Sequence, residues 1–208
     1  MLWKNHVKSL GFSILGILLF QLSFSQQNYL SGYVVKNNGD TLSGFIDYRN
    51  WDINPDKVDY KSKLEEKPIQ FKPTEILEFG VKNEIYVSGT VDIEISPIDI
   101  GMLEEDPQIH IQVNTVFLQT LVKGEKSLFY YKNQDRREYF YIKYNATLEL
   151  LIYKRYIKQR EGMRVIEENN KYLGQLALYL NDCSSIQAKF ENTPYRQKNL
   201  INLFHYYF

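Results

Sequence analysis

The fold is decided first by residues 29–48, which read YLSGYVVK, NNGD and TLSGFIDY. Two runs rich in β-branched and aromatic residues flank Asn38-Gly39. This dipeptide tolerates positive φ angles and is typical of a type I′ turn between antiparallel strands. The stretch therefore predicts a β-hairpin from Tyr29 to Tyr48.

A turn centred on Asn38-Gly39 also sets the register of this hairpin. The expected pairs are Val35 with Leu42, Tyr33 with Gly44, and Gly32 with Phe45. Each glycine then lies opposite an aromatic ring that covers it, an arrangement that compensates for the missing side chain.

The next segment, residues 49–107, alternates short apolar runs with turn signals. We expect short strands at 57–61 and 69–71, one helical turn at 74–77, a second hairpin of 84–88 with 91–95 about Gly89, and an exposed, mobile loop at 96–107. Trp51 lies in a turn-rich stretch and is interpreted as a plug over the end of the sheet. A ligand-stacking role for its ring is the alternative.

From residue 109 onward the pattern is that of a meander. The expected strands are 112–122, 127–132, 138–144 and 147–156, separated by polar turns. Phe140, Ile142 and Tyr144 fall on one face of the third strand, and Leu148, Leu150 and Ile152 on one face of the fourth. This alternation favours an antiparallel sheet with one buried side.

The last quarter of the chain changes from period 2 to the helical period. Leu173, Leu176, Ala177 and Leu180 form one apolar stripe after Asn169-Asn170, and Leu200, Leu203, Phe204 and Tyr207 form another. Thr193-Pro194 is expected to cap the second helix. The predicted fold is therefore α+β: an antiparallel sheet of short strands, with an N-terminal hairpin and a central meander, and two C-terminal amphipathic helices.

The N-terminus has the three parts of an export signal. Lys4 and Lys8 precede an apolar run from Leu10 to Leu22, and Ser23-Phe24-Ser25 matches a small-x-small cleavage pattern. We expect residues 1–25 to be a signal peptide and 26–208 to be one exported α+β domain, mainly β over 26–160 and mainly helical over 165–208. An uncleaved N-terminal anchor is the alternative. The expected location is periplasmic, extracellular or associated with the outer membrane.

Composition limits the function classes. Two of the 25 basic residues lie in the signal, so the exported part carries 23 basic against 25 acidic residues, and this near-neutral balance does not favour nucleic-acid binding. Cys183 is the only cysteine in the sequence, so no intrachain disulfide forms. We interpret it as a small buried residue at a helix end, with a reactive thiol as the alternative.

The sequence contains no assembled catalytic motif. Gly-rich phosphate loops, nucleophile elbows and zinc-protease signatures are missing, and the two histidines of the exported part, His110 and His205, lack partners at metal-ligand spacing. We therefore predict no catalytic, cofactor-binding or metal-binding residues and no cofactor.

Three features of the sequence are expected to form a solvated surface, but each also has a functional alternative. The acids Asp92, Glu94, Asp99 and Glu104-Glu105-Asp106 suggest a carboxylate pair or calcium site, the basic residues Arg155, Lys158, Arg160 and Arg164 suggest an anionic partner, and Asn145-Ala146-Thr147 is a glycosylation sequon.

Several runs resemble uncharacterised secreted proteins of the Bacteroidota type. They are residues 32–49, Phe71-Lys72-Pro73, Phe117-Leu118, Leu121-Val122-Lys123-Gly124 and Leu180-Asn181-Asp182-Cys183. In longer chains of that type, similar modules precede an outer-membrane β-barrel, whereas this chain stops at Phe208. The resemblance implies a periplasmic or surface location, and it carries over no catalytic residue.

The expected function is a non-enzymatic exported binding or structural module of the bacterial cell envelope. Its expected partner is an outer-membrane or other envelope protein, with no nucleic acid and no small-molecule cofactor. Two alternatives remain. One is a small outer-membrane β-barrel, because Phe204, Tyr206 and Phe208 alternate before an aromatic C-terminus. The other is a periplasmic enzyme whose site assembles from distant residues.

Overall fold

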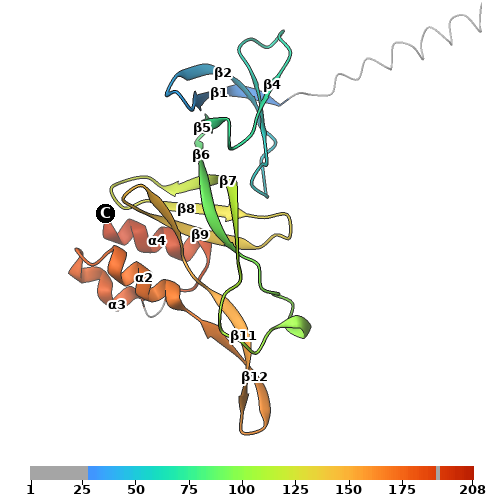
Figure 1. The fold of residues 1–208 in the computed structure, drawn as a ribbon. Helices are drawn as coiled ribbons and strands as arrows, with labels where there is room; N and C mark the ends of the chain where they lie inside the picture. The colour runs from blue at the N-terminus through green and yellow to red at the C-terminus, as the bar shows by residue number, and fades with distance from the viewer. Residues whose placement is uncertain (1–27, 191–192) are drawn as a thin grey trace, which may run out of the picture.

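A computed structural model describes residues 28–190 and 193–208 (Figure 1). The predicted signal peptide lies outside the described residues. The strands of the first half are β1 (Tyr29–Lys36), β2 (Thr41–Asp47), β3 (Val58–Lys61), β4 (Ile69–Phe71), β5 (Ile76–Val81) and β6 (Glu84–Glu94). Those of the second half are β7 (Ile111–Val122), β8 (Leu128–Lys132), β9 (Glu138–Tyr144), β10 (Thr147–Leu150), β11 (Lys154–Arg160) and β12 (Met163–Asn169). The helices are α2 (Lys171–Tyr179), α3 (Gln187–Phe190) and α4 (Gln197–Tyr207), with 3-10 turns at Ile100–Met102 and Ser184–Ile186. Within the described residues, no helix has the length and apolar character needed to span a membrane.

The architecture confirms the predicted α+β class. Among the described residues, ten antiparallel strands form one sheet in the order β10-β9-β8-β7-β6-β5-β1-β2-β3-β4, and β11 pairs only with β12. Three short helices follow, and they lie on one side of β7–β9 (Figure 1). The β11–β12 hairpin projects from the body of the molecule at the end opposite β1–β4.

The N-terminal hairpin is present, but its expected register is wrong by one residue. Gly32 pairs with Gly44, not with a ring, and Val34 pairs with Leu42. The reason lies in the loop. Lys36 and Asp40 close a three-residue connection in which only Gly39 has positive φ, at 89°, so the turn is not type I′. The extra loop residue shifts every pair.

The short strands β3 and β4 confirm the expectations at 57–61 and 69–71, while two other predictions in this segment are wrong. Residues 73–75 form a turn, and Ile76 and Leu77 already belong to β5. The expected hairpin about Gly89 is one continuous strand, β6, eleven residues long. Gly89 marks a close approach between strands instead: a Cβ atom there would lie 2.4 Å from Cδ1 of Leu148 in β10.

The meander is confirmed for β7, β8 and β9, but its fourth strand is not continuous. Strand β10 ends at Leu150, and Lys154 begins the separate β11–β12 hairpin. The turn of that hairpin is Glu161-Gly162, with φ angles of 51° and 81°. Two positive φ angles in a two-residue loop are typical of the type I′ turn that the sequence suggested at Asn38-Gly39.

The two C-terminal helices are confirmed, with a different start for the second. Helix α2 follows Asn170, as expected. Helix α4 follows Arg196, not Thr193, whose hydroxyl instead donates to the Lys189 carbonyl oxygen. Helix α3 was not expected. Phe204 and Tyr206 lie in α4, so their alternation does not form a strand.

Three apolar clusters form the core. One lies between the first five strands and the start of β6, around Phe79 and Ile46, and Trp51 packs on it. A second lies between β7–β9 and the helices, around Phe140 and Leu176. The third lies on the opposite face of β6–β10, around Tyr141 and Leu118. Because β10 packs over β6 at Gly89, the sheet from β6 to β10 curls around this third cluster.

Candidate functional site

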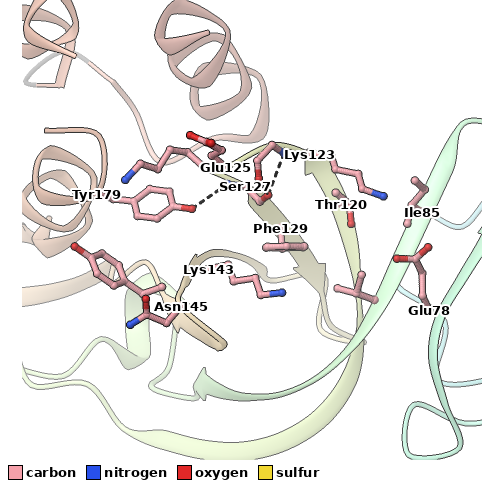
Figure 2. Close-up of a pocket in the computed structure, with 14 residues that line it drawn as sticks. Glu78, Ile85, Thr120, Lys123, Glu125, Ser127, Phe129, Lys143, Asn145 and Tyr179 are labelled. Carbon is pink, nitrogen blue, oxygen red and sulfur yellow. Dashed lines mark hydrogen bonds between the residues drawn. The ribbon is translucent and has the colours of Figure 1, made fainter. Parts of the chain in front are cut away.

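The curled part of the sheet, β6 to β10, has a cavity at each end. The first cavity, called here the open-end cavity, has a volume of about 580 Å³ and lies at the start of β6 and the end of β9 (Figure 2). The second lies at the end of β6 and the start of β9, and has a volume of about 490 Å³. Cavities of this size at the ends of curled sheets are common places for small ligands.

The inner wall of the open-end cavity is apolar. Ile85 and Val87 of β6 and Phe129 of β8 line it. These residues continue the third core cluster, since Phe129 belongs to it and Val87 packs against it. Figure 2 shows Phe129 between Ile85 on one side and Tyr179 on the other. The cavity therefore offers an apolar surface that adjoins the protein core.

The rim of the open-end cavity is predominantly basic. Lys123, Lys126 and Lys143 line it, against the two acids Glu78 and Glu125. The ammonium groups of Lys123 and Lys143 make no hydrogen bond or ion pair with another described residue. Figure 2 shows Lys143 extending into the cavity below Phe129. Two unpaired ammonium groups beside an apolar wall favour an anionic group on a partly apolar ligand.

Two of the three remaining charges at this rim, Glu78 and Lys126, have partners. The Tyr33 hydroxyl donates to Glu78 Oε1 at 2.6 Å. Burial and this hydrogen bond raise the pKa of Tyr33 to about 12, so the hydroxyl stays protonated and keeps donating. Lys126 lies over the Tyr179 ring, 4.8 Å from its centroid.

A helix and a tight loop fix the shape of the rim. The Ser127 backbone N–H donates to the Tyr179 hydroxyl oxygen at 2.9 Å, which ties α2 to the loop before β8. The Ser127 hydroxyl donates to the Gly124 carbonyl oxygen at 2.8 Å and closes that loop. Thr120 Oγ1 is buried at the cavity wall without a hydrogen-bond partner among the described residues. Its O–H could donate to an acceptor on a bound ligand, such as a carboxylate oxygen.

The structure disperses most of the candidates that the sequence suggested. Trp51 contacts Tyr48, Phe79 and Tyr86 edge-on, with ring centroids 5.2–5.8 Å apart, as expected of a plug. Cys183 is half-buried, not fully buried as expected, and its sulfur lies 3.2 Å from Ser185 Oγ. His205 lies in the last turn of α4. Asn145, the sequon residue, lies in the β9–β10 turn and lines the open-end cavity.

The acidic candidates do not gather into one site. Glu94 is buried against Arg137, and Glu104 binds Lys154 and lies 3.7 Å from His110. Lys154 holds the pKa of Glu104 below its usual range. Among the described residues, no group of three metal-ligating side chains is present. The loop at 96–107 is also less exposed than expected, since Ser96 and Leu103 are buried.

The basic stretch divides into two groups. Lys158 and Arg160 both contact Glu167 across the β11–β12 hairpin. Arg155 instead lines the second cavity, where its Nη2 donates to the Ile98 carbonyl oxygen. Lys158, Arg160 and Arg164 are exposed, as expected of a solvated surface. They lie on a hairpin, however, and Arg155 belongs to a cavity.

No protein-family model, curated protein or solved structure matches the chain. The case for a function therefore depends on the two cavities. Sequence reasoning missed both, because their walls combine residues from β5 to Arg196, just before α4. The one available signal was local: Lys123, Gly124 and Ser127 belong to the predicted turn and the strand after it, which borders the open-end cavity.

Proposed function

We propose that this protein is a non-enzymatic binding module of the bacterial cell envelope that holds a small amphipathic anion in the open-end cavity. The observation that carries the proposal is the pairing of an apolar wall, Ile85, Val87 and Phe129, with the unpaired ammonium groups of Lys123 and Lys143. An apolar tail gains free energy on that wall, while a carboxylate or phosphate head gains from the lysines.

The envelope location rests on the sequence alone. The export-type N-terminus and the resemblance to secreted Bacteroidota-type proteins both support it. Cell fractionation with mass spectrometry of the processed N-terminus tests it, and a start at Gln26 in the envelope fraction is the expected result. A chain that keeps its N-terminus and remains in the cytosol would contradict the location.

Calorimetric titration tests the binding site. We expect decanoate to bind saturably and decyltrimethylammonium, with a similar alkyl tail and the opposite charge, to bind at least tenfold more weakly. Ile85→Trp fills the cavity and should abolish binding. The matched control Leu77→Trp changes an exposed residue of β5 that does not line the cavity, and it should bind normally.

Equal binding of both detergents would contradict the anionic preference, and normal binding by Ile85→Trp would contradict the site. The non-enzymatic character has its own test. A hydrolase or transferase activity of the purified chain, abolished by one side-chain change at either cavity, would overturn it.

A further inference from the structure

The second cavity is built from five separate parts of the chain. They are the end of β6 with the loop after it, the start of β9, the segment from Leu150 to Arg155, Glu168 of β12, and Tyr195-Arg196 just before α4. Five basic residues line it, Arg136, Arg137, Lys154, Arg155 and Arg196, against three acids, Glu94, Glu138 and Glu168. The residues of this arginine-lined cavity differ from those of the open-end cavity.

The acids of the arginine-lined cavity already accept hydrogen bonds from the protein. Glu94, which is 2 % exposed, pairs with Arg137 and accepts the Ser96 backbone N–H at 2.8 Å. Glu138 accepts the Tyr130 hydroxyl at 2.9 Å, and Glu168 accepts the Tyr153 hydroxyl at 2.8 Å. These carboxylates are therefore partly occupied as acceptors.

Several arginine donors, in contrast, remain unused. Arg137 donates from Nη1 to the Ser96 carbonyl oxygen at 2.7 Å and pairs through Nη2 with Glu94. The Arg155 side chain makes one hydrogen bond, to the Ile98 carbonyl oxygen. The Arg196 backbone N–H donates to the Pro194 carbonyl oxygen, but its guanidinium makes no hydrogen bond or ion pair with another described residue. A guanidinium carries five N–H donors in a planar fork that fits a carboxylate or phosphate. The excess of donors favours a ligand group that only accepts.

Aromatic rings form a flat wall beside these donors. Tyr153 stacks on Tyr195 with centroids 4.9 Å apart and planes at 14°, and both line the cavity. Tyr172 packs edge-on against Tyr195 at 5.0 Å. The Tyr195 hydroxyl donates to the Leu151 carbonyl oxygen and accepts a hydrogen bond from the Phe140 N–H. These two hydrogen bonds fix the position of the Tyr195 ring. A rigid aromatic wall suits the apolar C–H face of a ring-shaped ligand.

We infer that the arginine-lined cavity binds an anionic sugar, a pyranose ring that carries a phosphate or a carboxylate. Arg155 and Arg196 bind the anionic group, and the ring packs on Tyr153. The inference does not depend on the open-end cavity, since the two sites share no residue and take different ligands.

Titration of the full exported chain with four compounds tests this inference. Glucose 6-phosphate and glucuronate represent the two sources of the anionic group, glucose lacks the charge, and inorganic phosphate lacks the ring. We expect at least one of the first two to bind at least tenfold more tightly than glucose and than inorganic phosphate. The compound that binds more tightly shows whether the anionic group of the ligand is a phosphate or a carboxylate.

Variants locate the site. Arg155→Gln and Arg196→Gln should each weaken binding of the preferred sugar at least tenfold. Arg164→Gln is the matched control, because Arg164 is exposed on the same hairpin and does not line the cavity. Tyr153→Phe keeps the ring and should keep most of the affinity, while Tyr153→Ala should lose it.

Three results would overturn the inference. They are binding of inorganic phosphate as tight as that of the sugars, an equal loss in Arg164→Gln and Arg155→Gln, or no saturable binding of either anionic sugar by a chain whose circular dichroism shows it folded.

Discussion

Asn54 and Lys132 pair with each other in both directions. The Asn54 backbone N–H donates to the Lys132 carbonyl oxygen at 3.1 Å, and the Lys132 N–H donates to Asn54 Oδ1 at 2.9 Å. The Asn54 amide also donates to the carbonyl oxygens of Phe117 and Tyr130. One buried side chain thus connects the loop before β3 with β7 and β8, 63 to 78 positions away.

Replacement of Asn54 should therefore be costly. Asn54→Ala leaves the Lys132 N–H and two carbonyl oxygens without their partner, so we expect a loss of about 3 kcal/mol in the free energy of unfolding. Urea denaturation measures it. Asn83→Ala, at an exposed turn, is the control and should change stability by less than about 0.5 kcal/mol. A small effect at Asn54 would mean that water replaces its hydrogen bonds.

The paired glycines of the first hairpin leave no room for a side chain. A Cβ atom on Gly44 would lie 2.3 Å from the Lys61 carbonyl oxygen, and one on Gly32 would lie 2.5 Å from that of Gly80. Backbone atoms cannot move aside as a flexible side chain does, so each alanine substitution should destabilise by about 1–3 kcal/mol.

Gly174 provides the opposite case. A Cβ atom there meets nothing within 4 Å, and the residue lies inside α2. Because alanine favours the helix, Gly174→Ala should stabilise the protein by about 1 kcal/mol. Melting temperatures of the three alanine variants compare the two effects. Stabilisation by Gly44→Ala would contradict the close packing of β2 against β3.

The buried pair Arg137–Glu94 predicts a non-additive response. Arg137→Met leaves the Glu94 carboxylate buried without its charged partner, so we expect a loss of about 3–4 kcal/mol. Because the double variant Arg137→Met/Glu94→Leu removes both charges, it should cost less than the single change. A double-mutant cycle in urea measures the coupling, and additive losses would show that the pair does not interact.

Tyrosine burial predicts sensitivity to alkaline pH. Burial raises the pKa values of Tyr33, Tyr48, Tyr153 and Tyr172 to about 12, with further help from Glu78, Glu84 and Glu168. Below about pH 10, both the folded and the unfolded chain keep these protons. Between about pH 10 and pH 12 only the unfolded chain releases them, so the stability they contribute is lost as the pH rises.

Urea midpoints from about pH 8 to pH 11 measure this loss, and tyrosinate absorbance should rise together with unfolding. Tyr153→Phe removes one of the groups and should make the decline shallower. A midpoint that stays constant through about pH 11 would contradict the raised pKa values.

Local sequence patterns predicted most of the elements of this fold, whereas features that depend on long-range packing were not predictable from them. The strands β1, β2, β7, β8 and β9 and the helices α2 and α4 follow from periodicity, because a sheet or helix surface needs its apolar residues on one face. The register of the first hairpin did not follow, since Asn-Gly fits both a two-residue turn and the three-residue loop found here. Gly89 suggested a turn because, in the sequence, a glycine at a close approach between strands looks the same as a glycine in a hairpin turn.

The sequence by itself determined the fold class of this protein, with its antiparallel strands and its helical end. Only the tertiary structure decided where the candidate binding sites lie. The curl of β6–β10, which depends on Leu148 packing over Gly89, brings Lys123 and Lys143 to one end and Arg155 and Arg196 to the other. Residues that are distant in the chain meet only because the sheet buries its third apolar cluster, and no local pattern records that long-range packing.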